Sequence, residues 1–172
     1  MSGLPLVWGA TPAEVLRDYR ADTAVAMPYV AMTRAIGVDA TPDVLYRWLC
    51  QLAVAPYSYD LLDNRGRRSP RELTPGAEVL VLGQTMTAIF DLVDVDPGRH
   101  WTGLTRSSRP FGKVAMTYAA EPGGQPGTSR LVCRITVEAT GRLGRAWALA
   151  LAWGDLVMIR KQFHTLKRLA EG

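Results

Sequence analysis

The sequence predicts an α+β fold in which a curved antiparallel β-sheet carries one long C-terminal α-helix on its concave face. Several strand-like segments follow one another between short turns, which is typical of an antiparallel meander. A long segment from about 144 to 170 then shows apolar residues at unbroken helical spacing. A chain of 172 residues, 48% of them hydrophobic, is also long enough to form a core without disulfides or a metal.

The first elements are expected near the N-terminus. Thr11 can cap a short helix, Pro12 suits its first position, and Glu14 supplies the carboxylate of a capping box. We therefore expect residues 1–27 to be an extension with one short helix, and 28–172 to be the ligand-binding domain.

The first long strand is expected at 29–38, where residues of one parity are apolar except Arg34. Thr41 and Pro42 then start a helix. Its apolar residues follow at helical spacing: Val44, Leu45, Trp48, Leu49 and Leu52.

The meander supplies most of an expected sheet of six or seven strands. The turn Asp96-Pro97-Gly98 and a Gly/Pro-rich loop at 122–127 separate its members. The expected strands are 86–95, 100–106, 113–120 and 130–139.

The C-terminal helix has a continuous apolar stripe made by Leu149, Ala152, Leu156, Ile159, Phe163, Leu166 and Ala170. Its first half, 146–154, is apolar almost all round, so it needs cover on more than one side. It either roofs a cavity or packs against a second copy of the chain. Gly154 either lets this half bend as a gate, or relieves crowding against a bulky strand residue.

Charge and composition exclude several function classes. The net charge is +4 and the isoelectric point about 9.3, but the basic residues are scattered among acidic ones, which favours a mixed surface over a nucleic-acid groove.

The two cysteines, Cys50 and Cys133, are expected to be small buried residues in a reducing cytosol, with no metal site. The longest apolar stretch, 146–159, is interrupted by Gly154 and Asp155 and is shorter than the ~20 residues of a membrane span. We expect a cytoplasmic protein.

The order of elements and several motifs resemble the START-like superfamily, also called SRPBCC. It includes polyketide cyclase/dehydrase-like proteins, lipid-transfer domains and relatives of the birch pollen allergen. Segment 36–49 resembles its opening strand-to-helix element, although Thr41 stands where proline is more common. Motifs similar to those of one bacterial branch lie at 57–60, 62–64, 97–99, 155–162 and 166–171. The resemblance covers about 28–171. It implies a helix-grip fold with a hydrophobic cavity between sheet and helix, but no fixed catalytic set.

Strand alternation suggests which residues face that cavity. The apolar parity of each strand is expected inside, whereas Thr117, Arg134 and Thr136 are expected to face outward. The parity around Trp101 is ambiguous, and we place Trp101 inside. The expected ligand-binding residues are Tyr57, Tyr59, Met86, Phe90, Trp101, Met116, Tyr118, Leu131, Cys133, Leu149, Trp153 and Leu156. The same residues could also simply fill a core.

Candidates for acid–base chemistry are few. Asp60 could serve as a base and Tyr118 as a hydrogen-bond donor to an enolate or carbonyl oxygen, with His100 as a third candidate. The alternatives are an ion pair of Asp60 with a nearby arginine, a satisfied core tyrosine, and a histidine at the rim.

These observations predict a protein that binds a hydrophobic or polycyclic small molecule, lipid-like or polyketide-like, in a central cavity. The alternative is a polyketide cyclase, aromatase or dehydratase acting in that cavity without a cofactor. Neither interpretation involves nucleic acid or a membrane span, and a homodimer is compatible with both.

Overall fold

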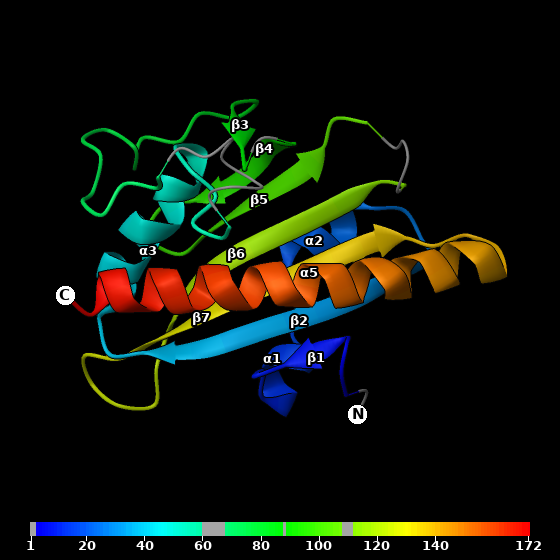
Figure 1. Cartoon of the computed structure of the whole chain (residues 1–172), viewed down its shortest axis with the longest axis horizontal. Coiled ribbons are helices and arrows are strands. Elements are labelled where there is room, and N and C mark those ends of the chain that lie inside the picture. Colours follow the sequence, from blue (N-terminus) through cyan, green and yellow to red (C-terminus); the bar gives the residue numbers. More distant parts are fainter. Residues whose placement is uncertain (1–2, 60–67, 88, 108–111) are drawn as a thin grey trace.

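The computed structural model describes residues 3–59, 68–87, 89–107 and 112–172. Within these residues, seven strands form one sheet in the order β1-β2-β7-β6-β5-β4-β3 (Figure 1). The strands are β1 (Val7–Trp8), β2 (Tyr29–Val38), β3 (Thr85–Met86), β4 (Phe90–Asp96), β5 (His100–Thr105), β6 (Val114–Pro122) and β7 (Ser129–Glu138). The helices are α1 (Pro12–Leu16), α2 (Arg20–Ala24), α3 (Pro42–Cys50), the short 3-10 helix η1 (Gln51–Ala53) and α5 (Gly141–Ala170).

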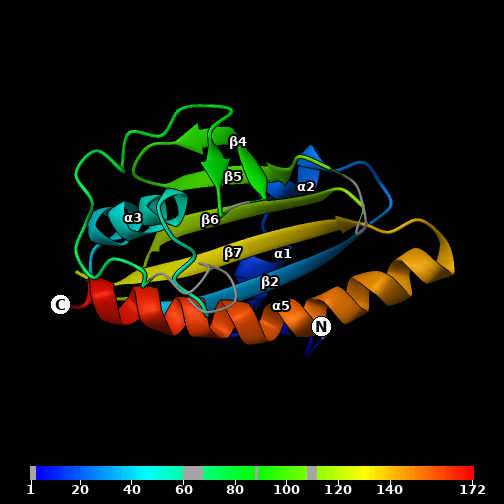
Figure 2. The same cartoon turned by 45° about the horizontal axis from the view of Figure 1, so that its top comes forward.

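The long helix α5 crosses one face of the sheet, and α3 packs at one end of the same face (Figures 1 and 2). The buried side of α5 consists of residues at helical spacing: Ala148, Ala152, Leu156, Ile159, Gln162, Phe163, Leu166 and Ala170. All of these except Leu156 and Gln162 join the core cluster that contains Leu45, Trp48 and Leu49 of α3. The predicted fold class, an α+β sheet with a C-terminal helix laid across it, is confirmed.

The strand register aligns four side chains in one row under the helix. Arg34 of β2 pairs with Cys133 of β7, Cys133 with Tyr118 of β6, and Tyr118 with Trp101 of β5. Trp101 is fully buried, stacks on Tyr118 with ring centroids 4.8 Å apart, and donates from Nε1 to the carbonyl oxygen of Leu49. The inward assignment of Trp101 is therefore confirmed, and α3 is tied to the sheet through it.

The opposite face of the sheet is covered by the N-terminal segment, which corrects one expectation. Thr117 and Thr136 are buried there, not exposed to water. The hydroxyl of Thr117 accepts from the amide of Ala21 in α2, and the hydroxyl of Thr136 donates to the carbonyl of the same residue. The short α2 was not predicted, because five residues give too little periodicity to recognise.

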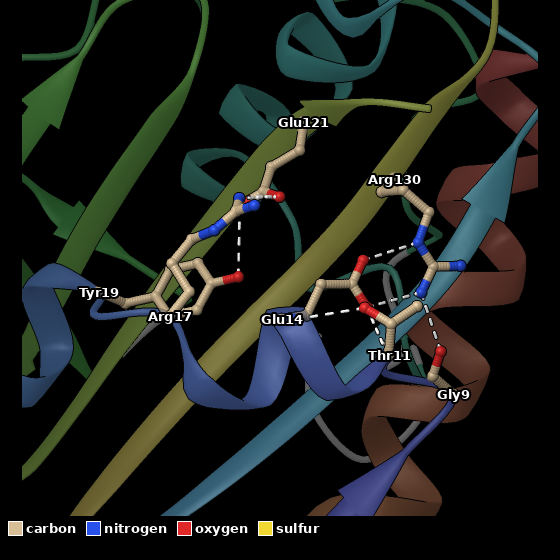
Figure 3. Close-up of polar contacts among 7 residues, drawn as sticks. All are labelled: Gly9, Thr11, Glu14, Arg17, Tyr19, Glu121 and Arg130. Atoms are coloured by element: carbon tan, nitrogen blue, oxygen red, sulfur yellow. Dashed lines mark hydrogen bonds and ion pairs between the residues drawn. The ribbon is translucent and has the colours of Figure 1, made fainter. Parts of the chain in front are cut away.

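Ion pairs fasten this N-terminal segment to the sheet (Figure 3). The guanidinium of Arg130 on β7 donates to both carboxylate oxygens of Glu14, at 2.7 and 2.9 Å, and to the carbonyl oxygen of Gly9. Arg17 pairs with Glu121 on β6. The predicted capping box is present, since the Thr11 hydroxyl accepts from the Glu14 amide and the Glu14 carboxylate accepts from the Thr11 amide.

Two other expectations need correction. The segment 86–95 is not one strand, because the chain turns between β3 and β4, and Thr87 adopts a φ of 44° there. The two pieces pair with each other as a short antiparallel hairpin. At the other edge, β1 was not predicted and runs parallel to β2. The strands at 29–38 and over the rest of the meander are confirmed to within two residues at each end.

Candidate functional site

A cavity with two adjoining compartments lies between α5 and the sheet. The first has a volume of about 580 Å³ and extends toward the segment after α3. The second, of about 750 Å³, is almost wholly apolar and extends toward the first half of α5. Four of the described residues line both compartments: Ile89, Phe90, Met116 and Asp155. The carboxyl group of Asp155 therefore lies on the wall between them.

Asp155 is held there by a buried arginine. The Nε of Arg34 lies 3.4 Å from Oδ2 of Asp155, and the Arg34 side chain is 0% exposed, whereas that of Asp155 is 27% exposed. Arg34 also donates to the carbonyl oxygen of Leu6, at 2.8 Å, and to that of Ala152 in α5, at 3.3 Å. A buried arginine requires partners of this kind, because an isolated buried charge costs several kcal/mol.

The surroundings change the acidity of Asp155. Burial raises the pKa of its carboxyl from the usual 3.8 to about 6, although the positive charge of Arg34 acts in the opposite direction. Burial also lowers the pKa of Arg34, but an arginine starts so high that it stays protonated near neutrality. Asp155 is thus a carboxyl that can exchange a proton close to neutral pH at the wall of an apolar cavity.

A second polar group in the cavity is fixed by its neighbours. The hydroxyl of Tyr118 donates to Oε1 of Gln162 on α5 at 2.6 Å, and Nε2 of Gln162 donates to the carbonyl oxygen of Pro56 at 2.7 Å. That carbonyl can only accept, which sets the orientation of the Gln162 amide. Burial holds the pKa of Tyr118 well above 10, so the phenol stays protonated. Its proton is engaged, so the expected role of Tyr118 as a donor to the ligand is not the one that this geometry supports.

Only part of the expected ligand-binding set lines the cavity. Phe90, Met116 and Tyr118 do so. Others are packed into the core and line neither compartment: Tyr57, Met86, Trp101, Leu131, Cys133 and Leu156. All six are buried, which agrees with the alternative that they simply fill the core.

Tyr59, Leu149 and Trp153 are exposed by 39%, 41% and 54%, and line neither compartment. The assignment of Leu149 and Trp153 to the cavity is wrong, because the buried stripe of α5 runs through Ala148 and Ala152. Two tryptophans, Trp147 and Trp153, are accessible on this half of the helix. Cover by a second copy of the chain stays a prediction.

The remaining catalytic candidates lie elsewhere. Because Trp101 points inward, the neighbouring His100 points to the opposite face, where its Nε2 lies 2.9 Å from Oδ2 of Asp94. His100 is therefore separated from the cavity by the sheet. Asp60 lies outside the described residues.

Asp155, which lines the cavity, and its buried partner Arg34 were missed as functional candidates, although the sequence carried a signal for both. Arg34 interrupts the apolar parity of its strand, and Asp155 interrupts the apolar stretch of the last helix. When two otherwise apolar segments pack against each other and each contains one residue of opposite charge, those two residues are best explained as an ion pair.

Within the described ranges, no group of three or more histidine, cysteine, aspartate or glutamate side chains could hold a metal ion. In the same residues, no helix combines the length and apolar character needed to cross a membrane.

No family model matches the sequence, and no curated protein matches it. Solved structures are similar in fold. A solution structure from Thermobifida fusca has a TM-score of 0.55 and 12% identity, over 81% of this chain and 94% of that one. The crystal structure of Ara h 8.0201 has a TM-score of 0.51 and 9% identity, over 83% and 97%.

A third structure is longer than this chain. The di-domain ARO/CYC protein StfQ from the steffimycin biosynthetic pathway has a TM-score of 0.51 and 14% identity, over 83% of this chain and 51% of that one. This chain thus matches about half of StfQ. At such identities the likeness establishes the architecture, and the chain has the helix-grip fold that its sequence motifs predicted.

Proposed function

We propose that the protein binds a hydrophobic or polycyclic small molecule in the cavity between α5 and the sheet. The observation that carries this proposal is the cavity itself, whose larger compartment of about 750 Å³ is lined mainly by Met32, Ile135, Val137 and other apolar side chains. Ligand sites of this kind are concave and mostly apolar, with volumes of about 300–1,000 Å³ and few polar groups that fix orientation.

The polar groups present suit a ligand with one or two acceptor or donor atoms. Asp155 offers a carboxyl at the wall between the compartments, and the Tyr118 oxygen can still accept a hydrogen bond although its proton is engaged. A carrier or sensor needs no more than this arrangement.

The test is to extract the purified protein with organic solvent and identify by mass spectrometry what co-purifies. Met116 lines both compartments, so the larger side chain of Met116→Trp should obstruct the space that they share and reduce the amount of extracted compound. Met27 is 76% exposed, so Met27→Trp is a control with the same chemical change outside the cavity. Extracts that are equally empty for all three proteins, or a compound retained in full by Met116→Trp, would contradict binding in this cavity.

A second candidate function is catalysis without a cofactor, and one observation favours it. The Asp155 carboxyl, with its pKa near 6, has the acidity expected of a general acid–base group near neutral pH. The ARO/CYC structures BexL and StfQ share the fold, which is compatible with cyclisation of a poly-carbonyl chain.

In that reaction Asp155 would remove a proton from a carbon between two carbonyl groups. The resulting enolate would form a carbon–carbon bond to a second carbonyl, and the alkoxide so formed would take the proton back from Asp155. Loss of water would follow for a dehydratase.

Turnover of a poly-β-ketone analogue distinguishes the two functions. Catalysis predicts product formation by the natural chain and a loss of at least about 100-fold in kcat for Asp155→Asn with binding retained. Binding of the analogue without turnover would leave the carrier or sensor function.

A further inference from the structure

A second hollow, of about 640 Å³, lies beside the C-terminal half of α5. Among the described residues, three basic side chains line it: Arg71, and Lys161 and Arg168 of α5. Lys161, Thr165 and Arg168 follow one another at intervals of four and three residues, so α5 presents them on one flank. This hollow is distinct from the compartments that contain Asp155.

The three basic groups have no anionic partner in the part of the chain that the structure describes. None of them takes part in the ion pairs found there, and no described aspartate or glutamate lines the hollow, which Gly172 also lines. Elsewhere on the surface Arg17, Arg106 and Arg130 are paired with carboxylates. Three positive charges around one depression, with no described carboxylate side chain paired to them, create a local positive potential that attracts an anion.

The hollow adjoins the apolar cavity. Ser58 lines both the hollow and the compartment of about 580 Å³. On α5, Lys161 of the hollow is followed directly by Gln162, which lines that compartment. The hollow and this compartment therefore share a wall at Ser58 and at the step from Lys161 to Gln162, so the basic side chains lie next to the apolar cavity.

We propose that the ligand is an amphipathic acid, whose apolar body fills the cavity and whose carboxylate or phosphate is bound by Arg71, Lys161 and Arg168. This inference rests on the proposed function, because it specifies the class of molecule bound at that cavity. Arginine suits both acids, since its guanidinium matches carboxylate and phosphate oxygens in pairs.

The experiment compares a charged probe with its neutral counterpart. The fluorescence of cis-parinaric acid and of its methyl ester is titrated with the natural chain and with the triple variant Arg71→Gln, Lys161→Gln, Arg168→Gln. The control is Arg47→Gln, Arg142→Gln, Arg145→Gln, which removes the same charge from exposed positions outside the hollow. Thermal unfolding of each protein verifies that it is folded.

The natural chain and the control should bind the acid about tenfold more tightly than the ester, an advantage that salt reduces. The triple variant should bind acid and ester alike, with the ester affinity unchanged. Displacement of the acid probe by dodecanoate or by dodecyl phosphate identifies which acid is preferred.

Equal affinity for acid and ester in the natural chain would overturn the inference and leave the proposed function intact. An affinity for the acid that is weakened equally in the triple variant and the control would also overturn it. The net positive charge of the protein would then explain the preference for the acid, without specific contacts in the hollow. Binding of neither probe would contradict the proposed function and this inference with it.

Discussion

Arg34 of β2, which is fully buried, and Asp155 of α5, which is partly exposed, form an ion pair that joins the sheet to the long helix, with 3.4 Å between Nε and Oδ2. The guanidinium is also anchored to the carbonyl oxygens of Leu6 and Ala152, so it is fixed from three sides. The pair therefore holds a carboxyl at the boundary between the two cavity compartments, where a bound molecule would meet it.

The first prediction concerns stability against pH. The folded-state pKa of Asp155, about 6, is above its usual value of 3.8, so the folded chain holds this proton more tightly than the unfolded chain. The resulting stability is fully present below pH 3.8 and is lost as the pH rises through 6, at up to about 1.4 kcal/mol per pH unit.

Asp155→Asn removes this titration. Urea unfolding between pH 4 and 7 should give a free-energy curve for the variant that lacks this decline. If the free energy of unfolding changes with pH in the same way in both proteins, the pKa of Asp155 is not raised in the folded state.

The second prediction concerns the other member of the pair. Arg34→Met removes the positive charge that lowers the pKa of Asp155 and leaves the carboxyl without an ionic partner. The pKa of Asp155 should therefore rise above 6. Removing one partner of a buried pair should also lower the free energy of unfolding by about 3 kcal/mol. Carboxyl-carbon NMR titration measures the first effect and urea unfolding the second. An unchanged or lower Asp155 pKa in the variant would mean that Arg34 does not act on the carboxyl.

The third prediction concerns Gly154 in α5. A Cβ added at this position would meet no heavy atom within 4 Å, so relief of crowding does not explain the glycine. Gly154→Ala should therefore raise the free energy of unfolding by about 1 kcal/mol, through helix propensity. If the first half of α5 moves as a gate, stopped-flow binding of a neutral probe should also become slower in both directions. Faster or unchanged rates in a stabilised variant would rule the gate out.

The fourth prediction concerns the N-terminal segment. Burial acts to raise the pKa of Glu14, but hydrogen bonds from Arg130 and Thr11 outweigh it and hold the pKa below its usual 4.5. A lowered pKa stabilises the fold above pH 4.5 and loses that effect as the pH falls through the folded-state value. Glu14→Gln should cost about 1–2 kcal/mol at pH 7, and the difference from the natural chain should shrink below pH 4. A difference that stays constant down to pH 3 would contradict this role.

Most of the fold could be predicted from the sequence because its long elements have strong periodicity. The strand at 29–38 and the final helix follow from patterns that extend over many residues. The division of 86–95 into β3 and β4 could not be predicted, since the alternation of Met86, Phe90 and Leu92 continues across the turn. The cover of the outer face by α2 depends on tertiary contacts of Ala21 that leave no local pattern.

The candidate site was harder to predict than the fold. Strand parity identified Phe90, Met116 and Tyr118 as cavity residues, but parity alone does not separate a cavity wall from a packed core. On α5, a difference of one residue between Ala148 and Leu149 decides which side chain is buried. The charged residues Arg34 and Asp155 become informative only when the fold brings them together.

The central claim is that the cavity between α5 and the sheet binds an apolar molecule. The most direct measurement is a fluorescence titration with the neutral probe N-phenyl-1-naphthylamine, using the natural chain, Met116→Trp and the exposed control Met27→Trp. The account predicts saturable binding to the natural chain and the control, and an affinity at least about tenfold weaker for Met116→Trp, because the new indole occupies the space that both compartments share. Equal affinity in all three folded proteins, or no saturable binding to the natural chain, would contradict it.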